Sequence, residues 1–239
     1  MSDGVLLALL ATAVTVGALV QGTVGLGLGL VAAPVVTLAD ASLMPELMLW
    51  LAAALPVLTL AREGRHADGR GLAWALLGRI PGTVVGVMVV AVASDRVLGL
   101  AVGGMVLLTV ALSVREVSVR IGRRSLVTAG LIGGVTGTAT SIGGPPLALL
   151  YQHRPGGEVR ATLAGYFCAG ALLSLAGLGV AGELRAREGL LALVLLPCLA
   201  VGFALSGPLR RRVDAGRIRA AILVVCAASA LALVVRSLV

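Results

Sequence analysis

The sequence has no lysine and few aromatic residues, and both shortages narrow the function classes. All 19 basic residues are arginine, and aromatic residues make up 3% of the 239-residue chain. The formal net charge of +8 could suggest a nucleic-acid partner. Such a surface needs clustered cations on a soluble face, usually with aromatic rings that stack on bases. The arginines instead stand in short segments between apolar runs, so we expect no nucleic-acid binding.

Cysteine and histidine are also scarce. Cys168, Cys198 and Cys226 stand singly in apolar stretches, and the chain contains no CxxC or cysteine–histidine metal spacing. His66 and His153 fall in predicted loops. The chain also lacks the glycine-rich Gly-x4-Gly-Lys-Ser/Thr loop of nucleotide hydrolases. We therefore expect no disulfide framework, no metal site, no cofactor and no ATP hydrolysis by this chain.

Long apolar runs are what the sequence has in quantity. Hydrophobic residues make up 59% of the chain, charged residues 13%, and the mean hydropathy is +1.07. Because a helix needs roughly 20 residues to cross a bilayer core, the pattern predicts an all-α polytopic membrane protein. The expected apolar segments are 4–38, 46–61, 72–93, 96–114, 125–151, 161–182, 189–209 and 217–238. The loops between them are short, which predicts one transmembrane domain over residues 1–239.

Two glycine clusters interrupt these runs about half a chain apart. Gly22-Thr-Val-Gly25-Leu-Gly27-Leu-Gly29 lies in the first run, and Gly137-Thr-Ala-Thr-Ser-Ile-Gly143-Gly144-Pro145-Pro146 lies in the fifth. The clusters are 115 residues apart, and a Pro-x4-Gly pattern recurs 116 residues apart, at Pro81 and Pro197. The constant offset predicts two internal repeats, residues 1–114 and 122–239.

The arginines distinguish two topologies, since Lys and Arg in short loops favour the cytoplasmic side. If all eight segments crossed once, ten arginines would lie on one side and eight on the other. If segments 4–38 and 125–151 each turn back at their glycines, the division becomes fourteen against four, with Arg79 inside a span. We therefore expect inverted-topology repeats, each a re-entrant glycine-rich helical hairpin plus three transmembrane helices. Both termini are then expected outside the cytoplasm.

The hairpin tips are the predicted substrate site. Broken helices at membrane depth survive only inside protein or beside a watery cavity, and half-helix N-termini favour anions. Arg79 is the one charge inside a predicted span, where it could bind an anion or extend to the headgroups. Close helix packing is the other explanation of the glycines, and hydroxyl groups could simply bond back to helical carbonyls. The candidate residues are Gln21, Thr23, Gly25, Gly27, Gly29, Arg79, Thr138, Thr140, Ser141, Gly143 and Gly144.

The chain resembles the sulfite exporter TauE/SafE family of bacterial membrane proteins. The resemblance rests on Gly22-x2-Gly25-x-Gly27-x-Gly29-x4-Pro34, on its counterpart Gly137-x5-Gly143-Gly144, and on Pro-x4-Gly in each half. It implies a multi-pass protein of the bacterial inner (plasma) membrane whose substrates are small sulfur-containing anions such as sulfite, sulfoacetate and other organosulfonates. Leu149 stands where Pro34 would have its counterpart, so the two hairpins are expected to differ in shape.

The leading hypothesis is a secondary transporter of a small anion, sulfite or an organosulfonate such as sulfoacetate, working by alternating access around the paired tips. An anion channel is the alternative. An intramembrane enzyme with Ser141 as nucleophile is a weaker one, since a nucleophile needs a base within hydrogen-bond reach and both histidines are in loops. Besides the small anion, membrane lipid is the expected partner. A proton or sodium as coupling ion, and a homo-oligomeric state, stay open.

Overall fold

The computed structural model describes residues 3–114, 120–212, 227–228 and 230–235. Within these ranges the regular structure is helical, as expected, with no strand. The α-helices are α1 (Asp3–Val24), α2 (Leu28–Ala39), α3 (Glu46–Glu63), α4 (Gly69–Val92), α5 (Asp95–Val114), α6 (Arg123–Thr140), α7 (Pro145–Tyr151), α8 (Gly156–Ala181) and α9 (Ala186–Arg212), with short 3-10 turns η1 (Ala41–Leu43) and η2 (Gly64–His66). Segment 217–238, expected as the last span, lies largely outside the described residues.

Several of these helices can cross a membrane by length and composition. In the part of the chain that is described, five qualify: Gly4–Val24, Glu46–His66, Gly69–Val92, Gly156–Ala181 and Ala186–Leu209. Large apolar side chains on their outer faces are exposed, among them Met88 at 63% and Leu190 at 64%. A soluble protein rarely presents so much apolar surface, and lipid is the environment that accommodates it.

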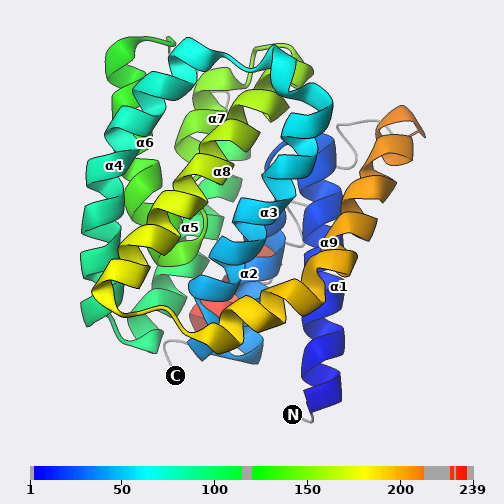
Figure 1. Ribbon diagram of the computed structural model, residues 1–239, viewed down its shortest axis with the longest axis vertical. Coiled ribbons are helices and arrows are strands. Elements are labelled where there is room, and N and C mark those ends of the chain that lie inside the picture. The colour runs from blue at the N-terminus through cyan, green and yellow to red at the C-terminus, as the bar shows by residue number, and fades with distance from the viewer. Residues whose placement is uncertain (1–2, 115–119, 213–226, 229, 236–239) are drawn as a thin grey trace.

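Two helix pairs form hairpins at the glycine clusters. The chain rises along α1, breaks at residues 25–27 and returns along α2 to the end of the bundle where it began (Figure 1). The α6–α7 pair enters from the opposite end and turns back over residues 141–144 (Figure 1). The breaks therefore fall where the glycines predicted them, and the two tips point in opposite directions.

Within each hairpin, the two helices differ in length. Two half-helices were expected in each, but α1 has 22 residues and α2 only 12, while α6 has 18 and α7 only 7. At ~1.5 Å per residue, α1 rises about 33 Å, enough to cross a hydrocarbon core of ~30 Å. The difference arises because each glycine cluster lies late in its apolar run, so the entering helix is nearly complete before the chain turns.

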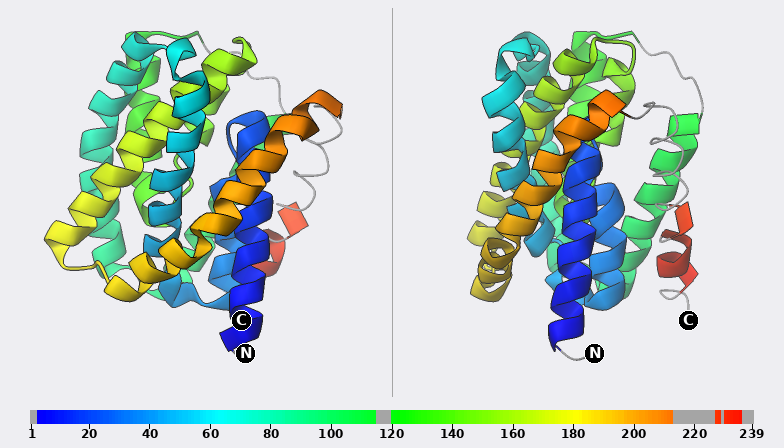
Figure 2. Two further views of the ribbon diagram at one scale, coloured as in Figure 1. Left: turned by 45° about the vertical axis from the view of Figure 1, so that its right-hand side comes forward. Right: turned by 90° about the vertical axis from the view of Figure 1, so that its right-hand side faces the viewer.

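The halves of the chain are interleaved. Helix α4 packs along α6, α1 along α9, and α3 along α8 (Figures 1 and 2). The contacts are close because glycine lets backbones meet: Gly82 of α4 lies against the Leu131 carbonyl of α6, and Gly202 of α9 against the Thr15 carbonyl of α1. Gly86, one turn after Gly82, likewise lies against the Val135 carbonyl and the Thr138 side chain of α6. Whether residues 1–114 and 122–239 are related by a two-fold axis stays a prediction.

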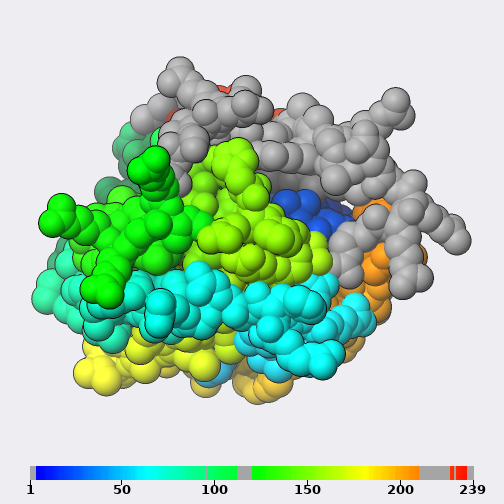
Figure 3. All heavy atoms as spheres, turned by 90° about the horizontal axis from the view of Figure 1, so that it is seen from above, coloured from blue at the N-terminus to red at the C-terminus, as the bar shows by residue number. Residues whose placement is uncertain are grey.

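Many of the described arginines lie near the two ends of the bundle. The turns between α3 and α4, before α6, and between α7 and α8 gather at one end, which Figure 3 shows face on. These turns and the adjoining helix ends carry Arg62, Arg65, Arg70, Arg120, Arg123, Arg124, Arg154 and Arg160. The opposite end, with the N-terminus, carries Arg96, Arg185 and Arg187 (Figure 2). We call these the arginine-rich and the arginine-poor end.

Candidate functional site

Arg79 is buried in the middle of the helix bundle. It lies in α4, eleven residues into the 24-residue helix, and its exposed fraction is 3%. Membrane proteins seldom bury a cation, because its removal from water costs several kcal/mol unless it is paired. The side chain therefore does not extend to the headgroups, which was one of the two roles weighed for it.

Glycines from three elements surround the guanidinium group. A methyl group built on Gly137 of α6 would lie 2.9 Å from Nη2 of Arg79, and one on Gly143 at the tip would lie 3.1 Å from Nη1. A methyl group on Gly170 of α8 would clash with Nε. Two of these positions belong to the second glycine cluster. The second glycine cluster therefore borders a buried cation in addition to packing against neighbouring backbone.

The Tyr166 ring completes this arrangement. The Cζ atom of Arg79 lies 4.5 Å from the ring centre, a cation–π distance. Tyr166 is fully buried in α8, and its hydroxyl donates a hydrogen bond to the Gly130 carbonyl at 3.3 Å. The ring thus holds the guanidinium from one face while the glycines approach its edge.

Two guanidinium nitrogens have no hydrogen-bond partner. Nε and Nη1 of Arg79 are both buried and unsatisfied, and no ion pair within the described residues involves this side chain. One helical turn further along α4, the Thr83 hydroxyl is also buried without a partner. Buried donors are nearly always satisfied in native proteins, so these donors stand out because the described residues give them no acceptor.

The tips of the two hairpins meet beside this cluster. Gly29 in the first turn of α2 lies against the Ser141 carbonyl, 2.7 Å from where its Cβ would be, and Leu26 lies against Gly144. Ser141 has a φ of 60°, the left-handed region that non-glycine residues seldom adopt. Its hydroxyl donates to the Pro45 carbonyl at 3.1 Å. The α6–α7 tip is thereby fixed against the start of α3.

The predicted hydroxyl residues fall into two groups. Thr23 and Thr140 donate to carbonyls of their own helices, those of Val20 and Thr136, at 2.7 Å each. Thr138 instead shares a 2.8 Å hydrogen bond with Ser174 of α8, whose hydroxyl also contacts the Gly170 carbonyl at 2.9 Å. Because Gly137 and Gly170 both border the guanidinium, the Thr138–Ser174 pair belongs to the Arg79 cluster.

The half-helix N-termini offer an anion fewer donors than the sequence suggested. At α2, the backbone N–H of Leu28 already donates to the Gln21 side-chain oxygen at 3.0 Å. At α7, the first two helical residues are Pro145 and Pro146, and proline has no backbone N–H. The positive charge of the candidate site therefore comes from Arg79 rather than from helix termini.

The first glycine cluster faces a different arginine. Gly25, with a φ of 93°, lies against the side chain of Arg160 at the start of α8, and Gly27 lies against Val20. The Arg160 guanidinium is occupied by an ion pair with Glu63 at 2.8 Å. Of the predicted site residues, the structure thus groups Arg79 with Thr138 and Gly143, brings Gly29, Ser141 and Gly144 to the tip contact, and leaves Gly25 outside.

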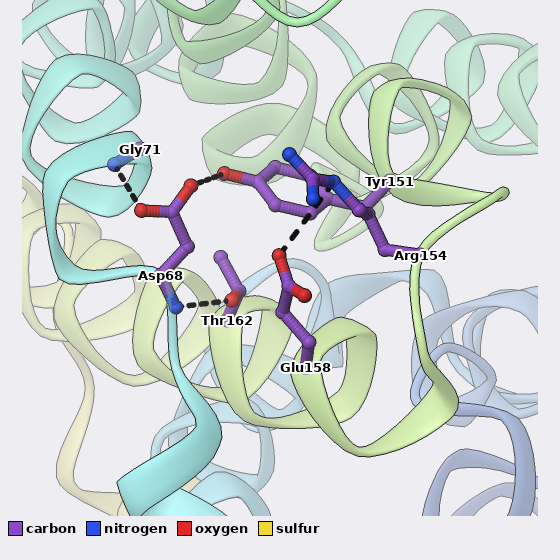
Figure 4. A network of polar contacts seen from close by, with 6 residues as sticks. All are labelled: Asp68, Gly71, Tyr151, Arg154, Glu158 and Thr162. Atoms are coloured by element: carbon purple, nitrogen blue, oxygen red, sulfur yellow. Dashed lines mark hydrogen bonds and ion pairs between the residues drawn. The ribbon is translucent and has the colours of Figure 1, made fainter.

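A polar network fastens α7 at the arginine-rich end. The Tyr151 hydroxyl donates to Asp68 at 2.7 Å, and the other Asp68 oxygen accepts from the Gly71 N–H at 2.9 Å (Figure 4). The Asp68 N–H donates to the Thr162 hydroxyl at 2.9 Å. Arg154 pairs with Glu158 nearby at 3.7 Å (Figure 4). The base of the α6–α7 hairpin is therefore tied to α4 and α8.

Sequence reasoning missed the contribution of α8. Tyr166, Gly170 and Ser174 follow one another at intervals of four residues, so they lie on one face of that helix. This spacing was a usable signal, because a tyrosine and a serine on one face of a transmembrane helix indicate a polar neighbour.

Comparison with known proteins identifies a family that the chain matches. The sulfite exporter TauE/SafE family matches residues 9–233. A protein of Cupriavidus necator described as a probable sulfite/organosulfonate exporter TauE is 29% identical over 152 residues, which cover 58% of each chain. The match thus spans little more than half the length of that relative. No solved structure matches the chain.

Proposed function

Because this chain belongs to the sulfite exporter TauE/SafE family, we propose that it exports a small sulfur-containing anion as a secondary transporter. Sulfite and organosulfonates such as sulfoacetate are the candidate substrates, in keeping with the description of the Cupriavidus relative. The transport cycle would alternate access to one site, and the buried Arg79 is the group around which we place it.

The unpartnered donors of Arg79 carry this proposal. A guanidinium offers its N–H groups in a planar fork that matches the oxygens of an oxyanion. Nε and Nη1 are the two nitrogens left without acceptors, and an anion beside either nitrogen would supply the missing acceptor. The Thr138–Ser174 hydroxyl pair would supply a further donor without adding charge once Ser174 no longer donates to the Gly170 carbonyl.

The α6–α7 tip would act as the gate. Gly143 lies directly against Nη1 in this structure, so an anion at that nitrogen requires the tip to move. The Ser141–Pro45 hydrogen bond joins the tip to α3, and its remaining contacts, with α2, Gly133 and Phe167, are packing contacts. The base of the hairpin is tied down by Tyr151 and Asp68. A movement confined to the tip would therefore open the Arg79 site.

Helix α9, which packs along the α1–α2 hairpin as α4 packs along the α6–α7 hairpin, has no charge at the position that corresponds to Arg79. The 116-residue offset that relates Pro81 to Pro197 relates Arg79 to Leu195, and Leu195 is buried in the apolar core. A single anion site, borne by the second hairpin and α4, follows from this asymmetry. We further propose that the arginine-rich end faces the cytoplasm and that both termini lie outside it.

Counterflow in proteoliposomes tests the function. Vesicles loaded with unlabelled sulfite or sulfoacetate should accumulate the labelled anion transiently, and Arg79→Leu should abolish this accumulation. Arg123→Leu, which removes an exposed arginine that contacts Trp74, is the matched control and should retain counterflow. Absence of counterflow with either anion would refute the proposed substrates. Anion flux without counterflow would indicate a channel instead.

The enzyme alternative has no structural support in the described residues. The Ser141 hydroxyl already donates a hydrogen bond to the Pro45 carbonyl, just before the start of α3. His66 lies in η2, beyond the other end of α3, and His153 lies in the turn between α7 and α8. A serine nucleophile needs a base within hydrogen-bond reach, so we propose transport and no catalysis.

A further inference from the structure

Two glutamates are buried at the arginine-poor end of the bundle. Glu46 is the first residue of α3 and Glu188 lies in the first turn of α9, with exposed fractions of 6% and 1%. Acidic residues are common in first helical turns, where they complement the helix dipole, but such residues usually face water. Burial of two carboxyl groups at one place calls for a separate explanation.

The two glutamates lie at neighbouring helix starts, where Trp50 of α3 comes close to Gly189 of α9. Glu46 interacts electrostatically with Glu188, Glu183 and Arg185. One Glu46 oxygen accepts the Arg185 backbone N–H at 3.2 Å, yet no ion pair holds either glutamate among the described residues. Arg185 itself is exposed. The negative charge of a doubly ionised pair would therefore be poorly compensated.

An unsatisfied oxygen points to what the pair binds. Oε2 of Glu188 is buried and has no hydrogen-bond partner. When two buried carboxyl groups share one environment, the charge of the first opposes ionisation of the second. A proton bound to one carboxyl group removes one of the two charges and supplies the missing donor to the other.

The pair also adjoins the proposed gate. Glu46 directly follows Pro45, whose carbonyl accepts the Ser141 hydroxyl of the α6–α7 tip. A change of charge at the start of α3 therefore occurs one residue from the contact that fixes this tip. If the glutamate pair binds a proton more tightly in one position of the α6–α7 tip than in the other, proton binding shifts the tip toward that position. Movement of the tip then changes the proton affinity of the pair by the same factor.

We propose that Glu46 and Glu188 bind one proton between them and that this proton is linked to anion transport through the seating of the α6–α7 tip on Pro45. This inference rests on the proposed function, because it takes the tip as the gate of the Arg79 site. The proton would come from the solution at the arginine-poor end, forming an O–H bond on one carboxylate oxygen and returning to that solution when the bond breaks.

The fluorescence of Trp50 can report the protonation of Glu46 and Glu188. Trp50 lies one helical turn after Glu46, and its indole nitrogen would be 3.6 Å from a Cβ on Gly189, the residue after Glu188. With Trp74→Phe as background, the emission of Trp50 should titrate with pH. The titration should vanish in both Glu46→Gln and Glu188→Gln and persist in Glu183→Gln, a half-buried neighbour of the same charge. A titration that persisted in either buried variant would overturn the shared site.

Anion exchange measures the link to transport. Counterflow of sulfoacetate is used at equal pH on both sides, because its sulfonate group does not titrate near neutral pH. One linked proton should change the rate by up to about tenfold per pH unit, and the profile should be flat in both buried variants but not in Glu183→Gln. A flat wild-type profile would refute the link while leaving the transport function intact. If neither sulfite nor sulfoacetate exchanges, the function and the link both fail, and the Trp50 titration still decides whether the pair binds a proton.

Discussion

The guanidinium of Arg79 lies over the ring of Tyr166, with Cζ 4.5 Å from the ring centre. A desolvated cation–π contact of this kind contributes on the order of 2 kcal/mol, which offsets part of the cost of burying the charge. The cation–π contact provides no hydrogen-bond acceptor for Nε and Nη1. The contact thus positions the cation and leaves its in-plane donors available.

Substitutions at Tyr166 should separate these two roles. Tyr166→Phe keeps the ring and loses only the 3.3 Å hydrogen bond to the Gly130 carbonyl, so we expect transport close to wild type and a loss of stability of about 1 kcal/mol. Tyr166→Leu removes the ring, and we expect at least a tenfold weaker apparent anion affinity, the equivalent of about 1.4 kcal/mol. Anion affinity from counterflow, measured beside thermal unfolding, distinguishes the outcomes. Equal affinity in both variants would contradict a positioning role.

Arg79→Leu should abolish transport without lowering the stability of the protein. An uncompensated buried charge is unfavourable, and its replacement by an apolar side chain is often neutral or stabilising by about 1–4 kcal/mol. We expect lost transport together with an unchanged or higher unfolding temperature in detergent. A variant that lost both transport and stability would show that Arg79 serves the fold instead.

Gly170→Ala should displace the Arg79 side chain. The added methyl group would clash with Nε, and the rigid α8 backbone cannot yield easily. We expect transport to fall at least tenfold with the protein still folded. Gly104→Ala is the matched control, because nothing lies within 4 Å of a Cβ at that position in α5. That variant should transport normally and, since alanine favours helix over glycine, gain up to about 1 kcal/mol.

Much of the architecture could be predicted from the sequence, because the bilayer restricts it. Apolar length predicted the spans, the glycine clusters predicted the breaks at residues 25–27 and 141–144, and Arg79 was identified as the one charge within a span. These predictions need only local sequence and the requirement that buried backbone be hydrogen-bonded.

The contents of the site could not be predicted in the same way. Gln21 appeared to be a ligand residue but caps α2, and the prolines that mark the α7 break also remove its donors. Tyr166 and Ser174 join Arg79 only because α8 crosses between α3 and α4, a tertiary arrangement (Figure 1). The acidic pair was missed for the same reason, since Glu46 and Glu188 are 142 residues apart and no local pattern connects them.

Asp68 should make stability depend on pH in the acid range. The N–H of Gly71 and the Tyr151 hydroxyl, both donating to its carboxylate, lower the pKa of Asp68 from its ordinary value. A lowered pKa contributes stability that is fully present above the ordinary value, about 3.9, and is lost as pH falls through the folded value. Asp68→Asn should therefore reduce the unfolding temperature at neutral pH and flatten its decline below about pH 4. An identical decline in both proteins would contradict this account.

Cysteine labelling should establish which end of the bundle faces the cytoplasm. Arg65 in η2 and Arg187 in the first turn of α9 are exposed arginines at opposite ends. Each can therefore be replaced by cysteine in a background whose Cys168, Cys198 and Cys226 are alanine. A maleimide that does not cross membranes should label Arg187→Cys in intact cells and label Arg65→Cys only after the membrane is opened. The expectation follows from the concentration of arginine at the Arg65 end, since cytoplasmic loops are enriched in cations. The reverse pattern would place the termini in the cytoplasm and would make the acidic pair face inward, so that its proton would come from the cytoplasm.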